Sequence, residues 1–140
     1  MKNGKNGSNG SNGKDHKFAY INGVAHEIKS NHTSVLKFVR ERISEKEVPS
    51  LCDDPNLAPY GACRVCSVDV ALKKDGPTKT VASCHTPVTE GSYIITQNEH
   101  LTELRKNIVE LVLTDHPMTC STCEVNNNCC LLYTSPSPRD

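Results

Sequence analysis

Cysteine is the residue type with the clearest chemical potential in this chain of 140 residues, which contains eight of them. Seven fall into two groups along the sequence: Cys52, Cys63, Cys66 and Cys84, and then Cys120, Cys123 and Cys129. The amino terminus lacks the basic-then-apolar pattern of a secretory signal, so a reducing, cytoplasmic location is expected. Thiolates in such a compartment bind metals more often than they form disulfides. Two groups of cysteines therefore predict two metal sites.

The first group has the spacing C-x10-C-x2-C-x17-C. Four thiolates are what a 2Fe-2S cluster requires, and the small residues Gly61, Ala62 and Ser67 beside the C-x2-C pair allow backbone N–H groups to approach cluster sulfurs. A zinc site with four cysteines is the alternative. Zinc sites usually combine two C-x2-C halves, whereas Cys52 and Cys84 stand alone here, so the spacing favours iron-sulfur.

The second group has the form H-x3-C-x2-C-x5-C, with His116 as its first member. A histidine near a helix end is often only a partner of the helix dipole, but the position before Pro117 and three cysteines favours His116 as a fourth ligand. Cys130 is a weaker candidate, because adjacent residues such as Cys129 and Cys130 point apart in most backbone conformations. A neutral imidazole adds less negative charge than a thiolate, so a cluster with one histidine ligand should be easier to reduce than its all-cysteine counterpart.

The elements that must position these ligands can be predicted from periodicity and turn signals. Strands are expected at 18–21 and 24–28 around the turn Asn22-Gly23, and a helix within 30–43 that Pro49 prevents from continuing. Residues 50–66 predict an irregular loop, and three further strands are expected at 67–72, 78–83 and 92–96. A second helix is expected at 99–115, with an apolar stripe at Leu101, Leu104, Ile108, Leu111 and Val112. These elements predict an α+β fold with a small mixed sheet.

Composition excludes several classes of partner. Lys plus Arg and Asp plus Glu both number 16, so no basic field is present to hold nucleic acid. No run of about 18 apolar residues occurs that would cross a membrane. Residues 1–15 hold almost only Asn, Gly, Ser and Lys and are expected to form a disordered leader.

The last eleven residues, CLLYTSPSPRD, match the translation of a transposase sequencing-library adapter in one reading frame. A natural Ser/Pro-rich tail is the alternative. We therefore expect residues 130–140 to be derived from an adapter and the natural protein to continue beyond Cys129.

Three segments carry a family resemblance: LCDDPNLAPYGACRVCSVDV, ASCHTPVTEG and HPMTCSTCEVNNNC. They resemble the start of the large iron-sulfur subunit of respiratory NADH dehydrogenase. NAD-linked formate dehydrogenase alpha subunits, iron-only hydrogenases and the diaphorase subunits of bidirectional hydrogenases are similar here. The resemblance covers about residues 17–129. It departs at Asn127, where the family usually has glycine, and at Cys130, where an acidic residue is usual. Because Asn tolerates a left-handed backbone, the first departure is expected to be mild.

The resemblance implies a ferredoxin-like beta-grasp 2Fe-2S domain at residues 16–98, followed by a small helical 4Fe-4S domain at 99–129. It implies that the first cluster is held by Cys52, Cys63, Cys66 and Cys84, and the second by His116, Cys120, Cys123 and Cys129. The expected function is electron relay between a redox partner subunit that contains flavin and the downstream domains of a larger oxidoreductase.

We also expect that the protein can associate peripherally with a membrane complex. The chain itself is expected to make and break no bonds of a substrate. The charged residues beside the first site, Asp53, Asp54, Arg64 and His85, are expected to be solvated or to form hydrogen bonds rather than to catalyse. A structural zinc-binding or partner-docking module is the alternative function.

Overall fold

The structure, a computed structural model, describes residues 16–134. The expected disordered leader at 1–15 and residues 135–140 of the expected adapter segment lie outside the described residues. In the described part of the chain, no helix is both long and apolar enough to cross a membrane.

The larger part of the described chain is built on one mixed sheet of five strands, as the sequence predicts. The strands are β1 (Phe18–Ile21), β2 (Val24–Glu27), β3 (Ser67–Ala71), β4 (Lys79–Ala82) and β5 (Tyr93–Ile95). Their order across the sheet is β2-β1-β5-β3-β4. The pair β1 and β5 is parallel, with Tyr20 opposite Tyr93 and Ile21 opposite Ile94, and the other pairs are antiparallel. The first and last strands in sequence are therefore neighbours in the sheet.

Two tight turns join the hairpins at the residues that the sequence predicts. Asn22 and Gly23 have φ values of 49° and 87°, which suits a two-residue turn between β1 and β2. Asp75 has φ 57° in the turn that precedes β4. The predicted hairpins are confirmed at both turns.

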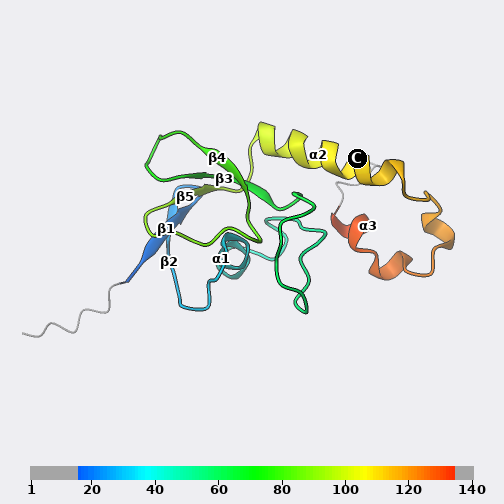
Figure 1. Ribbon diagram of the computed structural model, residues 1–140, viewed down its shortest axis with the longest axis horizontal. Coiled ribbons are helices and arrows are strands. Elements are labelled where there is room, and N and C mark those ends of the chain that lie inside the picture. Colours follow the sequence, from blue (N-terminus) through cyan, green and yellow to red (C-terminus); the bar gives the residue numbers. More distant parts are fainter. Residues whose placement is uncertain (1–15, 135–140) are drawn as a thin grey trace, which may run out of the picture.

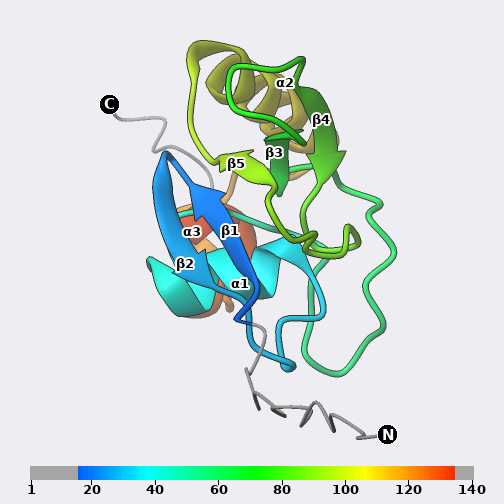
Figure 2. The same cartoon turned by 90° about the vertical axis from the view of Figure 1, so that its left-hand side faces the viewer.

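Helix α1 (Val35–Arg42) packs against one face of the sheet (Figure 2). The Ser34 side chain accepts a hydrogen bond from the backbone N–H of Lys37 and so caps the helix. Apolar side chains of α1 and of the strands share one core: Ala19, Ile21, Val35, Leu36, Phe38, Val39, Val48, Cys66, Val68, Ala82, Cys84 and Ile94. Two cysteines of the first group, Cys66 and Cys84, thus belong to the main core.

Helix α2 (Glu99–Thr114) runs from the sheet toward the second ligand group (Figure 1). Its buried side chains differ from the predicted stripe. Leu101 and Val109 are buried, whereas Leu111 and Val112 are 71% and 41% exposed. Residues four apart lie on one face of a helix, and α2 turns the face with Leu101 and Val109 toward the body of the protein. Arg105 lies between these two residues on the same face.

The chain beyond α2 is short and mostly irregular. It contains two 3-10 turns (Cys120–Thr122 and Asn126–Asn128) and the helix α3 (Cys130–Thr134). In Figure 1 this segment curls back beneath the end of α2. Leu131 of α3 is buried with Val65 and Val109 in a second apolar cluster, so α3 is packed against the rest of the chain.

Candidate metal centres

The four cysteines of the first group converge although three different segments carry them. Cys52 lies in the loop after α1, Cys63 and Cys66 lie in the segment that leads into β3, and Cys84 follows β4. The Cys63 side chain is within hydrogen-bonding reach of Cys52, and that of Cys84 is within reach of Cys66. Cys52 is also close enough to Cys84 for their charges to interact. These contacts link the four sulfurs pairwise and bring them near one another.

The side chain of Arg40 holds the loop that carries Cys52. Arg40 of α1 forms an ion pair with Asp53, with Nη1 and Oδ2 3.0 Å apart. Its Nη2 also donates to the Ser50 hydroxyl at 2.6 Å and to the Val48 carbonyl at 3.4 Å. A single guanidinium thus ties the residues on both sides of Cys52 to α1.

The segments of Cys66 and Cys84 are joined in a similar way. The fully buried Ser83 hydroxyl donates to the Cys66 carbonyl at 2.6 Å. The first turn of α1 then holds this segment, because the N–H of Leu36 donates to the Ser83 carbonyl at 2.9 Å. Helix α1 therefore orients cysteine segments at both ends of the first group.

Backbone N–H groups point at the sulfurs of the first group. Burial alone would raise the pKa of the Cys63 thiol, but hydrogen bonds from the backbone hold that pKa below its ordinary value. The donors to Cys63 are the N–H groups of Val65, Cys52 and Leu51. The N–H of Gly61, which has φ +67°, also lowers the pKa of Cys84, but by less than the burial and charges that raise it. Donors placed like this stabilise thiolates that ligate a metal.

The pKa of Cys84 is shifted in the opposite direction from that of Cys63. Burial raises the pKa of its thiol to about 12, and the hydrogen bond with Cys66 and the negative charges of Cys66 and Cys52 act in the same direction. Closely packed thiols resist simultaneous ionisation unless a metal replaces their protons. The donor set therefore fits a cationic metal group with four thiolate ligands.

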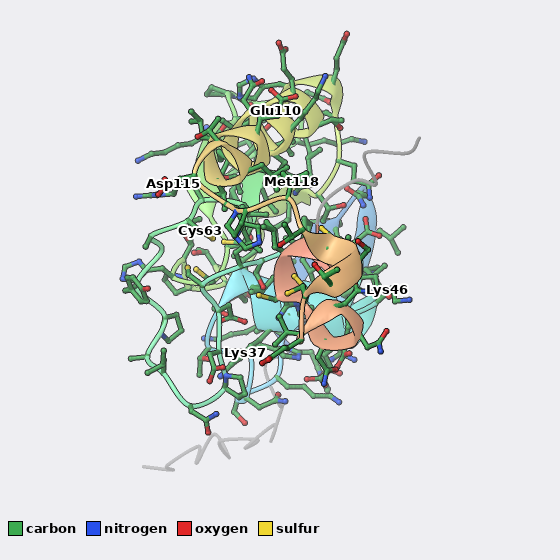
Figure 3. All side chains as sticks on the ribbon, turned by 90° about the vertical axis from the view of Figure 1, so that its right-hand side faces the viewer. Lys37, Lys46, Cys63, Glu110, Asp115 and Met118 are labelled. Carbon is green, nitrogen blue, oxygen red and sulfur yellow. The ribbon has the colours of Figure 1, made fainter. Side chains whose placement is uncertain are left out.

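The second group also gathers around one place. His116, Cys120, Cys123 and Cys129 line a small pocket together with Pro117, Asn126 and Leu132. The backbone N–H of Leu132 points at the Cys129 sulfur, with N and Sγ 3.4 Å apart. Cys130 does not line this pocket, so the structure places the predicted ligands together and leaves Cys130 outside. Figure 3 views this end of the molecule, with Cys63 of the first group labelled between α2 and the segment of the second group.

Short turns present the cysteines of the second group. The N–H of Cys123 donates to the Cys120 carbonyl at 3.4 Å, and the N–H of Asn126 donates to the Cys123 carbonyl at 3.1 Å. Asn127 lies within the 3-10 turn Asn126–Asn128 and has no positive φ. Asn127 therefore does not need the tolerance of a left-handed backbone on which the expected mildness of this departure was based, because a 3-10 turn keeps φ negative.

The charged residues beside the first group make structural contacts. Asp53 pairs with Arg40, and Asp54 accepts a hydrogen bond from the N–H of Asn56 at 2.8 Å. Arg64 has φ 62° in the turn between Cys63 and Cys66, and its carbonyl accepts from the Ser67 hydroxyl at 2.6 Å. Among residues 16–134, no three His, Cys, Asp or Glu side chains converge on a point that could hold a single metal ion.

Sequence reasoning missed two arginines that organise the first site, Arg40 and Arg105. Arg105 donates through Nη2 to the carbonyls of Ser67 at 2.7 Å and Thr96 at 2.8 Å. The signal that could have found Arg105 is its spacing of four residues from both Leu101 and Val109, which puts it on the buried row of α2.

Two family profiles match the sequence over the two cysteine groups. The profile described as 2Fe-2S iron-sulfur cluster binding domain matches residues 20–99. The profile described as NADH-ubiquinone oxidoreductase-G iron-sulfur binding region matches residues 105–132. The first match covers more than half of the 140 residues.

Curated relatives are similar over more than half of the chain. The alpha subunit of an NADPH-Fe(3+) oxidoreductase from Geobacter sulfurreducens is 38% identical over 82 residues, which are 59% of this chain and 9% of the relative. The G subunit of the NADH-quinone oxidoreductase from Salmonella typhimurium is 37% identical over 84 residues, again 59% of this chain and 9% of the relative. The chain thus matches less than a tenth of the length of these relatives.

A solved structure described as an NAD+-reducing [NiFe]-hydrogenase in the H2-reduced state shares the fold, with a TM-score of 0.65. The alignment covers 82% of this chain and 45% of that chain, at 24% sequence identity.

These matches decide between the two chemistries that the spacing left open for the first group. The chain has one 2Fe-2S binding region and one 4Fe-4S binding region, and it is an iron-sulfur electron-transfer module of the kind present in these oxidoreductase subunits. Because the match at residues 20–99 covers more than half of the chain, the chain belongs to the family of 2Fe-2S iron-sulfur cluster binding domains.

Proposed function

We propose that the chain relays single electrons from a redox partner subunit that contains flavin to further redox centres of a larger oxidoreductase. The ligands that we propose for the 2Fe-2S cluster are Cys52, Cys63, Cys66 and Cys84, and those for the 4Fe-4S cluster are His116, Cys120, Cys123 and Cys129. Both clusters supply one-electron chemistry when bound. The protein contributes ligands, hydrogen bonds and exclusion of water.

The observation that carries this proposal is the apolar cluster shared by the two ligand groups. Val65, Val109 and Leu131 are buried together, and Cys63 of the first group and Cys129 of the second both pack against them. Val65 is fully buried and stands between Cys63 and Cys66 in sequence. Packed apolar side chains exclude water and keep the ligand groups at a fixed separation, which favours electron transfer between them.

The sheet supports the finer assignment of a beta-grasp fold to residues 16–98. A hairpin, then a helix on one face, and then a last strand that inserts beside β1 in parallel are the features on which we base it. We propose a second small domain at 99–129, and the matches at 20–99 and 105–132 support a boundary between them.

The adapter interpretation of residues 130–140 stays a prediction, which sequencing of the genomic locus tests. Leu131 is 8% exposed and packs against Val65 and Val109. We therefore expect an apolar residue at position 131 of the natural protein as well.

The partner assignment rests on the relatives. Those proteins are named as subunits of an NADPH-Fe(3+) oxidoreductase and of NADH-quinone oxidoreductases. We propose that this chain likewise works against a partner subunit, in the cytoplasm, with peripheral association where the whole complex is bound to a membrane. The experiment that follows also tests against the structural zinc-binding or partner-docking module that the sequence left as an alternative.

Anaerobic reconstitution of the chain with iron and sulfide tests the ligand assignment. We expect a brown protein that gives two electron paramagnetic resonance signals on reduction. Cys66→Ser should remove only the 2Fe-2S signal and Cys123→Ser only the 4Fe-4S signal. A colourless protein that binds stoichiometric zinc in preference to iron would favour the structural alternative.

Substitution in the shared apolar cluster tests the relay itself. Val109→Asp places a charge among apolar side chains near Cys63 and Cys129 and should slow electron exchange between the two sites after rapid partial reduction. Glu110→Gln, at an exposed position next to it, is the matched control. Unchanged exchange in Val109→Asp, with both signals intact, would contradict the proposed route.

A further inference from the structure

Arg105 is the charged side chain that α2 turns toward the sheet. It lies one helical turn after Leu101 and one before Val109, both of which are buried. Its neighbour Lys106 points to solvent, with a side chain that is 65% exposed. A guanidinium is cationic at any physiological pH, so α2 holds a fixed positive charge on its inner face.

The hydrogen bonds of Arg105 bring this charge next to the first ligand group. Its Nη2 donates to the carbonyl of Ser67 at 2.7 Å, and Ser67 follows Cys66 directly in sequence. The same Nη2 donates to the carbonyl of Thr96 at 2.8 Å. The Nε atom is buried and has no hydrogen-bond partner among the described residues. The guanidinium is therefore held against the backbone of the Cys66 segment.

Three groups that can carry negative charge lie near enough to the guanidinium to affect its pKa. Burial lowers the pKa of Arg105, and the charges of Cys66, Glu47 and Asp69 oppose this shift. Glu47 and Asp69 are themselves committed to hydrogen bonds, from the Thr96 hydroxyl at 2.6 Å and from the Asn98 amide at 2.7 Å. Cys66 thus lies close enough for the charge of a ligand thiolate to act on Arg105, and the hydrogen bond to the Ser67 carbonyl fixes the guanidinium at this place.

We propose that Arg105 raises the reduction potential of the 2Fe-2S site by holding a half-buried positive charge against the segment of Cys66. This inference rests on the proposed function, because it needs the cluster on Cys52, Cys63, Cys66 and Cys84. Reduction adds one negative charge to the cluster, and a nearby positive charge stabilises that state in a medium of low dielectric. Arg105 therefore raises the reduction potential of the site.

The experiment is a redox titration of the reconstituted chain, followed by the electron paramagnetic resonance signal of each cluster. Arg105→Gln should shift the midpoint of the 2Fe-2S signal to lower potential and move that of the 4Fe-4S signal less. Arg105→Lys keeps the charge and should retain most of the wild-type midpoint. Lys106→Gln removes the same charge from the exposed face of α2 and should leave both midpoints unchanged.

A second variant removes a negative charge near Arg105 instead of the positive charge itself. Glu47→Gln removes a carboxylate that faces Arg105 and should shift the 2Fe-2S midpoint to higher potential. An intact 2Fe-2S signal with an unchanged midpoint in Arg105→Gln would overturn the proposal. An equal fall in Arg105→Lys and Arg105→Gln would also overturn it, because the guanidinium would then act only as a strap between α2 and the backbone. Failure of the unmutated chain to bind iron would count against the proposed function instead.

Discussion

The side-chain amide of Asn98 donates to the buried carboxylate of Asp69, with Nδ2 and Oδ2 2.7 Å apart. The carbonyl oxygen of the same amide accepts from the N–H of Leu101 at 2.7 Å and caps α2. Because Asp69 belongs to β3, one side chain both begins α2 and fixes its first turn to the sheet.

Asn98→Ala should lower the free energy of unfolding by about 2 kcal/mol, from loss of the helix cap and of a partner for a buried charge. Asn98→Ser retains a capping oxygen and should lose about half as much, since only the contact with Asp69 disappears. Urea unfolding of the iron-loaded chain, followed by visible absorption, measures both. Equal losses in the two variants would show that the cap contributes little.

Gly61 and Gly23 make a matched pair for separating backbone strain from effects on the site. Their φ values are +67° and +87°, so alanine at either position should cost about 1 kcal/mol of stability. Only Gly61→Ala disturbs an N–H that points at the Cys84 sulfur, so it alone should change the visible spectrum of the 2Fe-2S site. Spectral change in Gly23→Ala would contradict this assignment.

The hydrogen bonds of Glu41 predict that the free energy of unfolding falls at acidic pH. Its pKa is lowered by hydrogen bonds from Asn31 first and then from the buried His32, at 2.8 and 2.9 Å. A lowered pKa in the folded state stabilises the fold above the unfolded pKa, and this contribution is lost as pH falls through the folded pKa.

The melting temperature of Glu41→Gln should therefore lie below that of the wild type near neutral pH, with the difference closing below about pH 4. Glu45→Gln, at an exposed position of the same region, controls for the loss of one surface charge. Scanning calorimetry across this range measures the two differences. A constant gap at all pH values would argue against the carboxylate.

Cys130 provides a direct test of the second ligand set. Cys130→Ser should retain the 4Fe-4S signal, since Cys130 does not line the pocket with the other cysteines. His116→Ala should lose that signal or shift its midpoint. Both variants are compared after the same anaerobic reconstitution, by iron content and electron paramagnetic resonance. Loss of signal in Cys130→Ser together with its survival in His116→Ala would reverse the assignment.

Much of the fold was predictable because local signals and tertiary structure agree. Asn22-Gly23 fixes the first turn, and Ser34 caps α1 where its apolar run begins. The buried row of α2 was not predictable from the apolar stripe, because Leu111 and Val112 remain exposed and a charged residue occupies the inner face. The partners of that residue, Ser67 and Thr96, are distant in sequence, and no local pattern reports them.

The candidate ligands were predictable as two groups from spacing alone, since cysteines that bind one metal group recur at short intervals. The contacts that hold these ligands in place were not predictable. The N–H groups that face Cys63 and Cys84 depend on loop conformation, including a positive φ at Arg64 that no propensity favours. Likewise, the contact of Cys63 and Cys129 with one apolar cluster depends on how α2 leaves the sheet.

The parallel pairing of β1 with β5 has a consequence for the order of events during synthesis. Tyr20 meets Tyr93, so the middle of the sheet closes only after the ribosome has delivered every residue between them. Until then the chain can form two separate hairpins, the second of which already brings the segments of Cys66 and Cys84 together, but the hairpins are not yet joined. Contacts so distant in sequence make folding slow. All four cysteines of the first group precede β5, so the ribosome delivers them before the strand that joins the two hairpins into one sheet.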